Sequence, residues 1–132
     1  MKETVFLNLR FAGSTKPVSA QANISIPFKV KTIHVKSVCY QTSFGLGANQ
    51  YCVLKSNIDS NNSPLAILFQ NSDYSSATVN DIEIQLRNPE IIHGTYDFLI
   101  YNMQDALVGT TNSGQDDYIT LVLEFNSPDE IL

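Results

Sequence analysis

The chain has 132 residues, of which 43% are apolar and only 16% charged, and its net charge is −5. This length and apolar fraction fit one globular domain whose core needs neither metal nor disulfide support, and they exclude a disordered chain. The acidic balance excludes nucleic acid as a direct ligand, because neutralising phosphates requires clustered Lys and Arg. We therefore expect residues 1–132 to form a single domain, with a short flexible acidic tail from about residue 127.

Apolar and polar residues alternate through most of the chain, which is the pattern of half-buried β-strands. The first predicted strand is Glu3–Phe11. The second is Ala22–Val30, where Pro27 indicates a sheet edge or a break near the end of the strand. Thr32–Thr42 and Gln50–Ile58 are the third and fourth strands, joined by a glycine-containing loop.

The second half of the chain contributes four more predicted strands. Leu65–Phe69 lacks alternation, which predicts a short strand buried on both faces in the middle of the fold. The polar segment Asn71–Thr78 is expected to be a loop, and it is followed by the strands Asp81–Leu86, Gly94–Met103 and Asp117–Asn126. Eight strands with no helix predict an all-β, eight-stranded antiparallel β-sandwich, and the jelly roll is the commonest arrangement of this kind.

An immunoglobulin-like sandwich is the rival fold, but the chain has no Trp, and Cys39 and Cys52 are too close in sequence to form that fold's inter-sheet pair. A hairpin centred on residues 45–47 would place Cys39 opposite Cys52 and Tyr40 opposite Tyr51. This register permits a cross-strand disulfide. In a reducing compartment the pair would instead stay as two small buried thiols.

Residues that commonly carry catalysis or bind metals are sparse. His34 and His93 are the only histidines, and they do not have a metal-ligand spacing. No nucleophile elbow, phosphate-binding loop or dinucleotide fingerprint occurs, and Asp105, Asp116 and Asp117 lack the ordered spacing of a calcium loop. The sequence therefore predicts no catalytic residue, no metal site, no cofactor and no enzymatic activity.

The basic residues and the hydropathy profile give two further expectations. Lys29, Lys31 and Lys36, with His34 between them, are expected to form one solvated strand face. No stretch has the length of a transmembrane helix, and the first residues become polar too soon for a signal peptide. We therefore expect no membrane span and a cytoplasmic location.

A strand rhythm in the second half of the chain resembles a known family. Residues 80–86 (NDIEIQL) lead into residues 91–102 (IIHGTYDFLIYN), and residues 118–125 (YITLVLEF) form the last strand. This rhythm is similar to that of the small single jelly-roll penton or minor capsid proteins of virophages and related double-jelly-roll DNA viruses. The resemblance implies a non-catalytic structural subunit that forms pentamers at icosahedral vertices beside neighbouring capsid proteins. Such a subunit would be found in the virion, after assembly in the host cytoplasm or nucleus.

The composition is compatible with self-assembly. Asn, Gln, Ser and Thr make up roughly a third of the chain, well above their usual share. Such a surface suits contact between subunits, because few charges lose their water. Four tyrosines are candidate assembly contacts, although the same residues would also fit at ordinary sheet edges: Tyr40, Tyr51, Tyr74 and Tyr101.

Two alternatives remain open. A carbohydrate-binding or adhesin-like module would use the neutral loops 56–63 and 71–78 to present amides to sugar hydroxyls, although the chain has neither Trp nor an export signal. A domain of a larger intracellular complex is the third possibility.

Overall fold

The computed structural model describes residues 1–11, 19–41, 51–59, 61–69, 75–78, 82–101 and 117–131. In chain order the elements are β1 (Lys2–Phe11), β2 (Ser19–Gln41), β3 (Tyr51–Ser56), β4 (Pro64–Phe69), β5 (Ser75–Thr78), β6 (Ile82–Tyr101), β7 (Asp117–Asn126) and the short 3-10 helix η1 (Pro128–Ile131). The strands form one antiparallel sheet in the order β1-β7-β2-β6-β3-β4, and β5 pairs with β2. This confirms the predicted all-β, antiparallel class. In the described ranges, no helix is long and apolar enough to span a membrane.

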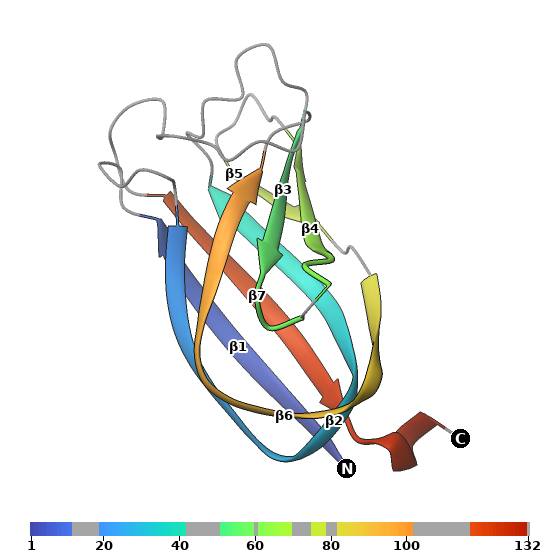
Figure 1. Ribbon diagram of the computed structural model, residues 1–132. Helices are drawn as coiled ribbons and strands as arrows, with labels where there is room; N and C mark the ends of the chain where they lie inside the picture. The colour runs from blue at the N-terminus through green and yellow to red at the C-terminus, as the bar shows by residue number, and fades with distance from the viewer. Residues whose placement is uncertain are drawn as a thin grey trace.

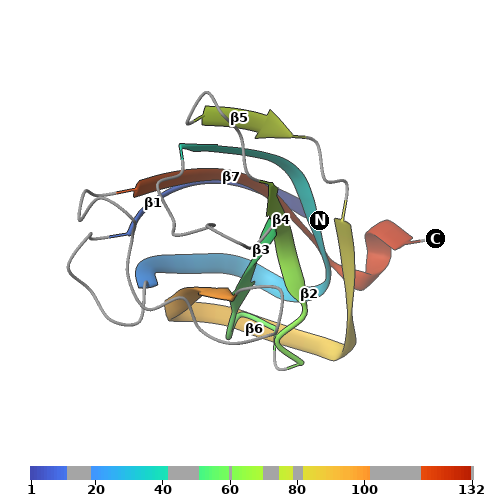
Figure 2. The same cartoon turned by 90° about the horizontal axis from the view of Figure 1, so that it is seen from above.

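Two long strands, β2 and β6, give the sheet its curvature (Figure 1). The first part of β2 pairs with the last part of β6, from Ser19↔Leu99 to Ser25↔His93, whereas the second part of β2 pairs with β7. Both strands bend between these parts. As a result, β1, β7 and the second part of β2 face the first part of β2 and the last part of β6 across the interior (Figure 2). The described residues therefore form a half-barrel.

Two irregularities in the β2–β6 pairing mark this bend. Residues 26–28 of β2 stand against residue 92 alone, and residues 86–89 of β6 stand against Lys31 alone. Pro27 lies in the first irregularity, where its missing N–H removes no ladder hydrogen bond. The break predicted near Pro27 is a register shift in the pairing and not an end of the strand. The chain remains extended through both sites. For this reason the prediction of eight strands is not confirmed: two pairs of predicted strands are each one continuous strand, and β5 is an additional strand, so the described residues form seven.

Lys31 has a specific role at the second irregularity. Its Nζ donates hydrogen bonds to the carbonyl oxygens of Leu86 (2.6 Å) and Arg87 (3.0 Å). These carbonyls lie in the part of β6 that has no register partner on β2. Lys29 and Lys36 are exposed, as predicted, but Lys31 is half-buried and binds the backbone, so the expectation of one solvated basic face is wrong for it.

The core lies on the concave side of the half-barrel and follows the predicted alternation. From β1 and β7 it receives Leu7, Leu9, Phe11, Ile119, Leu121, Leu123 and Phe125, all buried. In β2 a register shift between Val35 and Ser37 keeps both Val35 and Val38 buried although they are three residues apart. The large buried side chain of Phe98 comes from β6, opposite Ala20 of β2 and Ser56 of β3.

Two further predictions are corrected. β4 carries the buried residues Leu65, Ala66 and Leu68, but it lies at the end of the strand order and not in its middle. Its burial comes from the curvature of the sheet, which places an end strand over the core. Residues 75–78 form β5 and are not part of a loop, because their backbone pairs with β2 from Val38 to Gln41.

The end of the chain packs beside its beginning. β7 ends at Asn126, and the backbone N–H of the buried Ser127 donates to the carbonyl of Met1 (2.9 Å). Pro128–Ile131 then forms η1, which contacts β2 and β7. The flexibility of the tail stays a prediction.

Candidate functional site

The outward face of the paired β2 and β6 segments carries a row of hydrogen-bonded polar side chains. Because residues opposite each other in an antiparallel pair point to the same face, alternate positions of the two strands meet there. Gln21 Nε2 donates to Asp97 Oδ1 at 2.7 Å. Thr95 Oγ1 donates to Asn23 Oδ1, and Ser25 Oγ lies 2.9 Å from His93 Nδ1.

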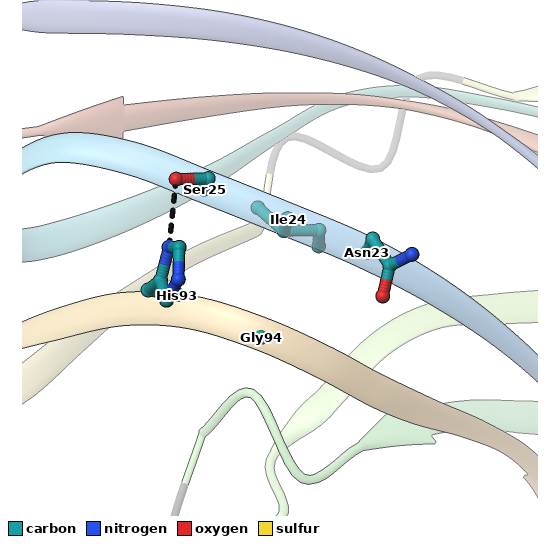
Figure 3. Close-up of a pocket in the computed structure, with 5 residues that line it drawn as sticks. All are labelled: Asn23, Ile24, Ser25, His93 and Gly94. Atoms are coloured by element: carbon teal, nitrogen blue, oxygen red, sulfur yellow. Dashed lines mark hydrogen bonds between the residues drawn. The ribbon is translucent and has the colours of Figure 1, made fainter.

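A shallow hollow of about 240 Å³ lies at the end of this row (Figure 3). It is lined by Asn23, Ile24, Ser25, His93 and Gly94. Gly94 has a φ of +142°, a conformation that favours glycine, and no atom lies within 4 Å of the position that a Cβ would occupy. No atom fills the space beside Gly94, and the exposed lining of the hollow is mostly apolar, with few polar atoms.

The Ser25–His93 pair does not have the arrangement of a nucleophile and its base. Ser25 Oγ contacts Nδ1 of the imidazole, whereas in the Ser-His-Asp arrangement the serine contacts Nε2 and a carboxylate holds Nδ1. Both side chains are exposed, so water is not excluded from the pair. His93 lies within the continuous strand β6, and its backbone N–H donates to Tyr96 Oη (2.9 Å). The geometry shows a hydrogen bond between two exposed side chains.

The turn between β3 and β4, one of the two loops considered for sugar binding, is organised by Asp59. This residue is buried, and its carboxylate accepts hydrogen bonds from the backbone N–H groups of Asn61 and Ser63, both at 3.1 Å. Asn62 closes the turn with a φ of 54°. The exposed Asn57 places its Oδ1 against the backbone N–H of Asp97 (2.9 Å), next to the polar row. The side-chain amide of Asn57 therefore binds the backbone of β6, and the Asp59 carboxylate binds the backbone of the turn.

Of the four tyrosines that were predicted as assembly contacts, the three in the described residues lie on three different strands. Tyr40 stands opposite Ile119 and Ser76, and Tyr51 stands opposite Phe69, so the predicted Tyr40–Tyr51 pairing is wrong. Tyr101 is half-buried beneath the Lys55 ammonium, which lies 4.7 Å from the centre of its ring. Tyr74 lies outside the described residues. The role of these residues in assembly stays a prediction.

The predicted cross-strand cysteine pair is also not formed. Cys39 stands opposite Ala77 and Thr120, and Cys52 stands opposite Leu68, because β2 is flanked by β5, β6 and β7 while β3 pairs with β4 and β6. Both cysteines are free, Cys39 exposed and Cys52 buried. Burial raises the pKa of the Cys52 thiol from 9.0 to about 11.

The two thiols should therefore differ sharply in reactivity, since the thiolate is the nucleophile. In the folded protein a maleimide should label one thiol per chain, on Cys39, and a second should react only after unfolding. Because the folded-state pKa of Cys52 is raised, the free energy of unfolding should fall as the pH rises from 9.0 towards 11. Denaturant titrations at pH 9 and pH 11 measure this decrease in the free energy of unfolding, and Cys52→Ala should remove the part that Cys52 causes. Equal labelling of both thiols in the native protein would contradict the burial of Cys52.

The alternation of β1 predicts its buried face correctly, and it also contains an exception on the exposed face. Phe6 stands at a position where its neighbours on the same face, Thr4 and Asn8, are polar, and its side chain is 74% exposed. Tyr118 of β7 is exposed on the same side of the sheet, since it stands opposite Arg10 of β1. A large aromatic residue on the polar side of an alternating strand is the pattern that could have identified this surface.

The described residues contain no cluster of three or more His, Cys, Asp or Glu side chains that could hold a metal ion.

No protein-family model matches the chain, and no curated protein matches it. The chain is similar in structure to the mavirus penton protein, with 10% identity over 95% of this chain and 100% of that chain and a TM-score of 0.48. It is also similar to the Drosophila NLP-core, whose structure concerns pentamer formation and histone binding, with 13% identity over 94% and 100% of the two chains and a TM-score of 0.42. The decameric BFDV capsid protein has 11% identity over 96% and 98% and a TM-score of 0.32. The chain thus bears a weak resemblance to viral penton and capsid proteins.

Proposed function

We propose that this chain is a non-catalytic structural subunit of the capsid type, a single jelly-roll-like domain that assembles with copies of itself. The observation that carries the proposal is the edge strand β1. Its central residues, Thr4 to Leu9, contain no charge, proline or bulge, and the side chain of Phe6 is 74% exposed. Proteins that stay monomeric usually protect such an edge with one of these devices. Among the described strands only β7 pairs with β1, so its other edge is suited to receive a partner.

The surface composition supports the same reading. With 16% charged residues, the chain can bury surface against a neighbour without removing many charges from water. The viral part of the proposal comes from the strand rhythm of residues 80–125, which resembles that of penton proteins. On this proposal the subunit lies in the wall of a virion, as a pentamer beside other capsid proteins.

Light scattering after size exclusion, at two protein concentrations about a hundredfold apart, tests self-assembly. The proposal predicts one discrete oligomer at the higher concentration. A monomer at both concentrations would refute it.

A second candidate, binding of neutral carbohydrate, is favoured by one observation: the hydrogen-bonding row on β2 and β6 ends at the open hollow beside Gly94. A glycan array tests this candidate. Binding of a defined glycan that is lost in His93→Ala but kept in Lys29→Ala, an exposed position on the neighbouring part of β2, would support it. Absence of binding to any glycan would eliminate it.

A further inference from the structure

β1, β7 and the second part of β2 form one layer of the fold, and β1 lies at one edge of this layer. β1 pairs with β7 along its whole length, from Lys2↔Asn126 to Phe11↔Asp117, without any register shift. Within the described part of the chain, nothing pairs with the other side of residues 3–9. This edge therefore offers a straight row of backbone donors and acceptors.

The opposite edge of the same layer is formed by two segments in line. β5 and Ile82–Gln85 of β6 both pair with the second part of β2, on the side away from β7. β3 reaches β6 only at residues 98–101, so in the described ranges no strand pairs with the far side of Ile82–Gln85. Figure 2 shows β5 and β1 in the same layer, with β7 and the second part of β2 in it as well.

The two edges span the same register rows and run in opposite directions. The register rows run from Thr4 through Glu124 and His34 to Glu83, and from Arg10 through Tyr118 and Gln41 to Ser75. Because every neighbouring pair in these rows is antiparallel, β1 runs opposite to β5 and Ile82–Gln85. A second copy, rotated about an axis along the strands, would therefore present its β1 antiparallel to this far edge.

The charges near the two edges are also complementary. Lys2 is exposed on β1, two positions from Thr4 and on the same face, and its Nζ lies 3.9 Å from Glu124 Oε1 within the same chain. Glu83 is exposed in the row of Thr4. In an antiparallel pair, residues diagonal to each other lie within reach of long side chains. Lys2 of one copy would thus face Glu83 of the next.

We propose that the partner of the β1 edge is a second copy of this chain, joined by antiparallel pairing of β1 with the edge formed by β5 and Ile82–Gln85. The inference deepens the proposed function and depends on it. Since two different surfaces meet, the interface is heterologous and closes into a ring when the rotation between copies closes. Phe6 lies on the face of this joint and becomes buried at it.

Phe6→Ser tests the joint, because it removes an exposed ring whose loss costs the folded monomer little. Burial of a Phe side chain corresponds to about a thirtyfold change in an association constant. We expect the concentration at half-assembly, measured by light scattering, to rise about thirtyfold or more. Tyr118→Ser is the matched control, since Tyr118 is an exposed aromatic residue on the same side of the sheet but on the inner strand β7. Its half-assembly concentration should stay near that of the unmodified protein.

Charge reversal tests which edge meets β1. Lys2→Glu and Glu83→Lys should each weaken assembly, and the double variant should restore it, because the pair is re-formed with exchanged signs. Circular dichroism spectra must show that each variant is folded.

The outcomes separate the joint from the proposed function. Loss of assembly in Phe6→Ser with restoration in the double charge variant supports the joint. An oligomer that persists in Phe6→Ser, Lys2→Glu and Glu83→Lys would overturn the joint while leaving self-assembly in place. A monomeric unmodified protein at every concentration would overturn both.

Discussion

Replacing Phe98 with Ala should lower the free energy of unfolding by about 4 kcal/mol, the largest effect that we expect from a single substitution. The ring is fully buried, and β6 carries it into the core between Ala20 of β2 and Ser56 of β3. Truncation would leave a cavity where three strands meet, at a place where the curved backbone cannot easily collapse. Urea titration followed by circular dichroism measures the loss.

Phe28→Ala is the control for this prediction. Phe28 is half-buried at the bend of β2 and packs against the edge of the core, so the same truncation should cost about 1 to 2 kcal/mol there. If the two variants were equally stable, the last part of β6 would not line the core as described.

Lys31→Met should lower the free energy of unfolding by about 2 kcal/mol. Methionine keeps most of the aliphatic stem but loses the ammonium that binds the carbonyls of Leu86 and Arg87. Hydrogen bonds to charged groups contribute more than neutral ones, and the half-buried position reduces that contribution through solvent screening. The loss should appear as a lower urea midpoint with an unchanged slope.

Lys29→Met provides the matched control, because it removes the same charge from an exposed position two residues away. We expect a change within about 0.5 kcal/mol. Equal losses in the two lysine variants would show that net charge, and not the contact with the β6 carbonyls, causes the effect.

The sequence predicts the strands of this fold better than it predicts their pairing. Alternation depends on which face of a strand is buried, so β1 and β7 lie close to where their patterns place them. Pairing depends on distant contacts, and the hairpin proposed for Cys39 and Cys52 fails because each cysteine has a different neighbouring strand. Local spacing contains no information about a sheet that places β7 beside β2.

The irregularity of β6 at residues 86–89 also depends on a distant contact that the local sequence does not show. Polar and turn-forming residues such as Arg87, Asn88 and Pro89 indicate a break in a strand, but they do not distinguish a loop from a bulge within a continuous strand. The difference here depends on Lys31, which lies 55 positions before Leu86 in the sequence and satisfies the carbonyl that the bulge leaves unpaired. The hollow beside Gly94 was missed for a similar reason, since Gly94 was predicted to begin a strand and lies within the longer strand β6.

Native mass spectrometry of the unmodified protein tests the central claim of self-assembly most directly. We expect one dominant species that contains a fixed number of copies, three or more, of the 14.7 kDa chain. A heterologous joint closes only when several copies complete the ring. A spectrum that contains only the 14.7 kDa chain at concentrations up to the solubility limit would contradict the account.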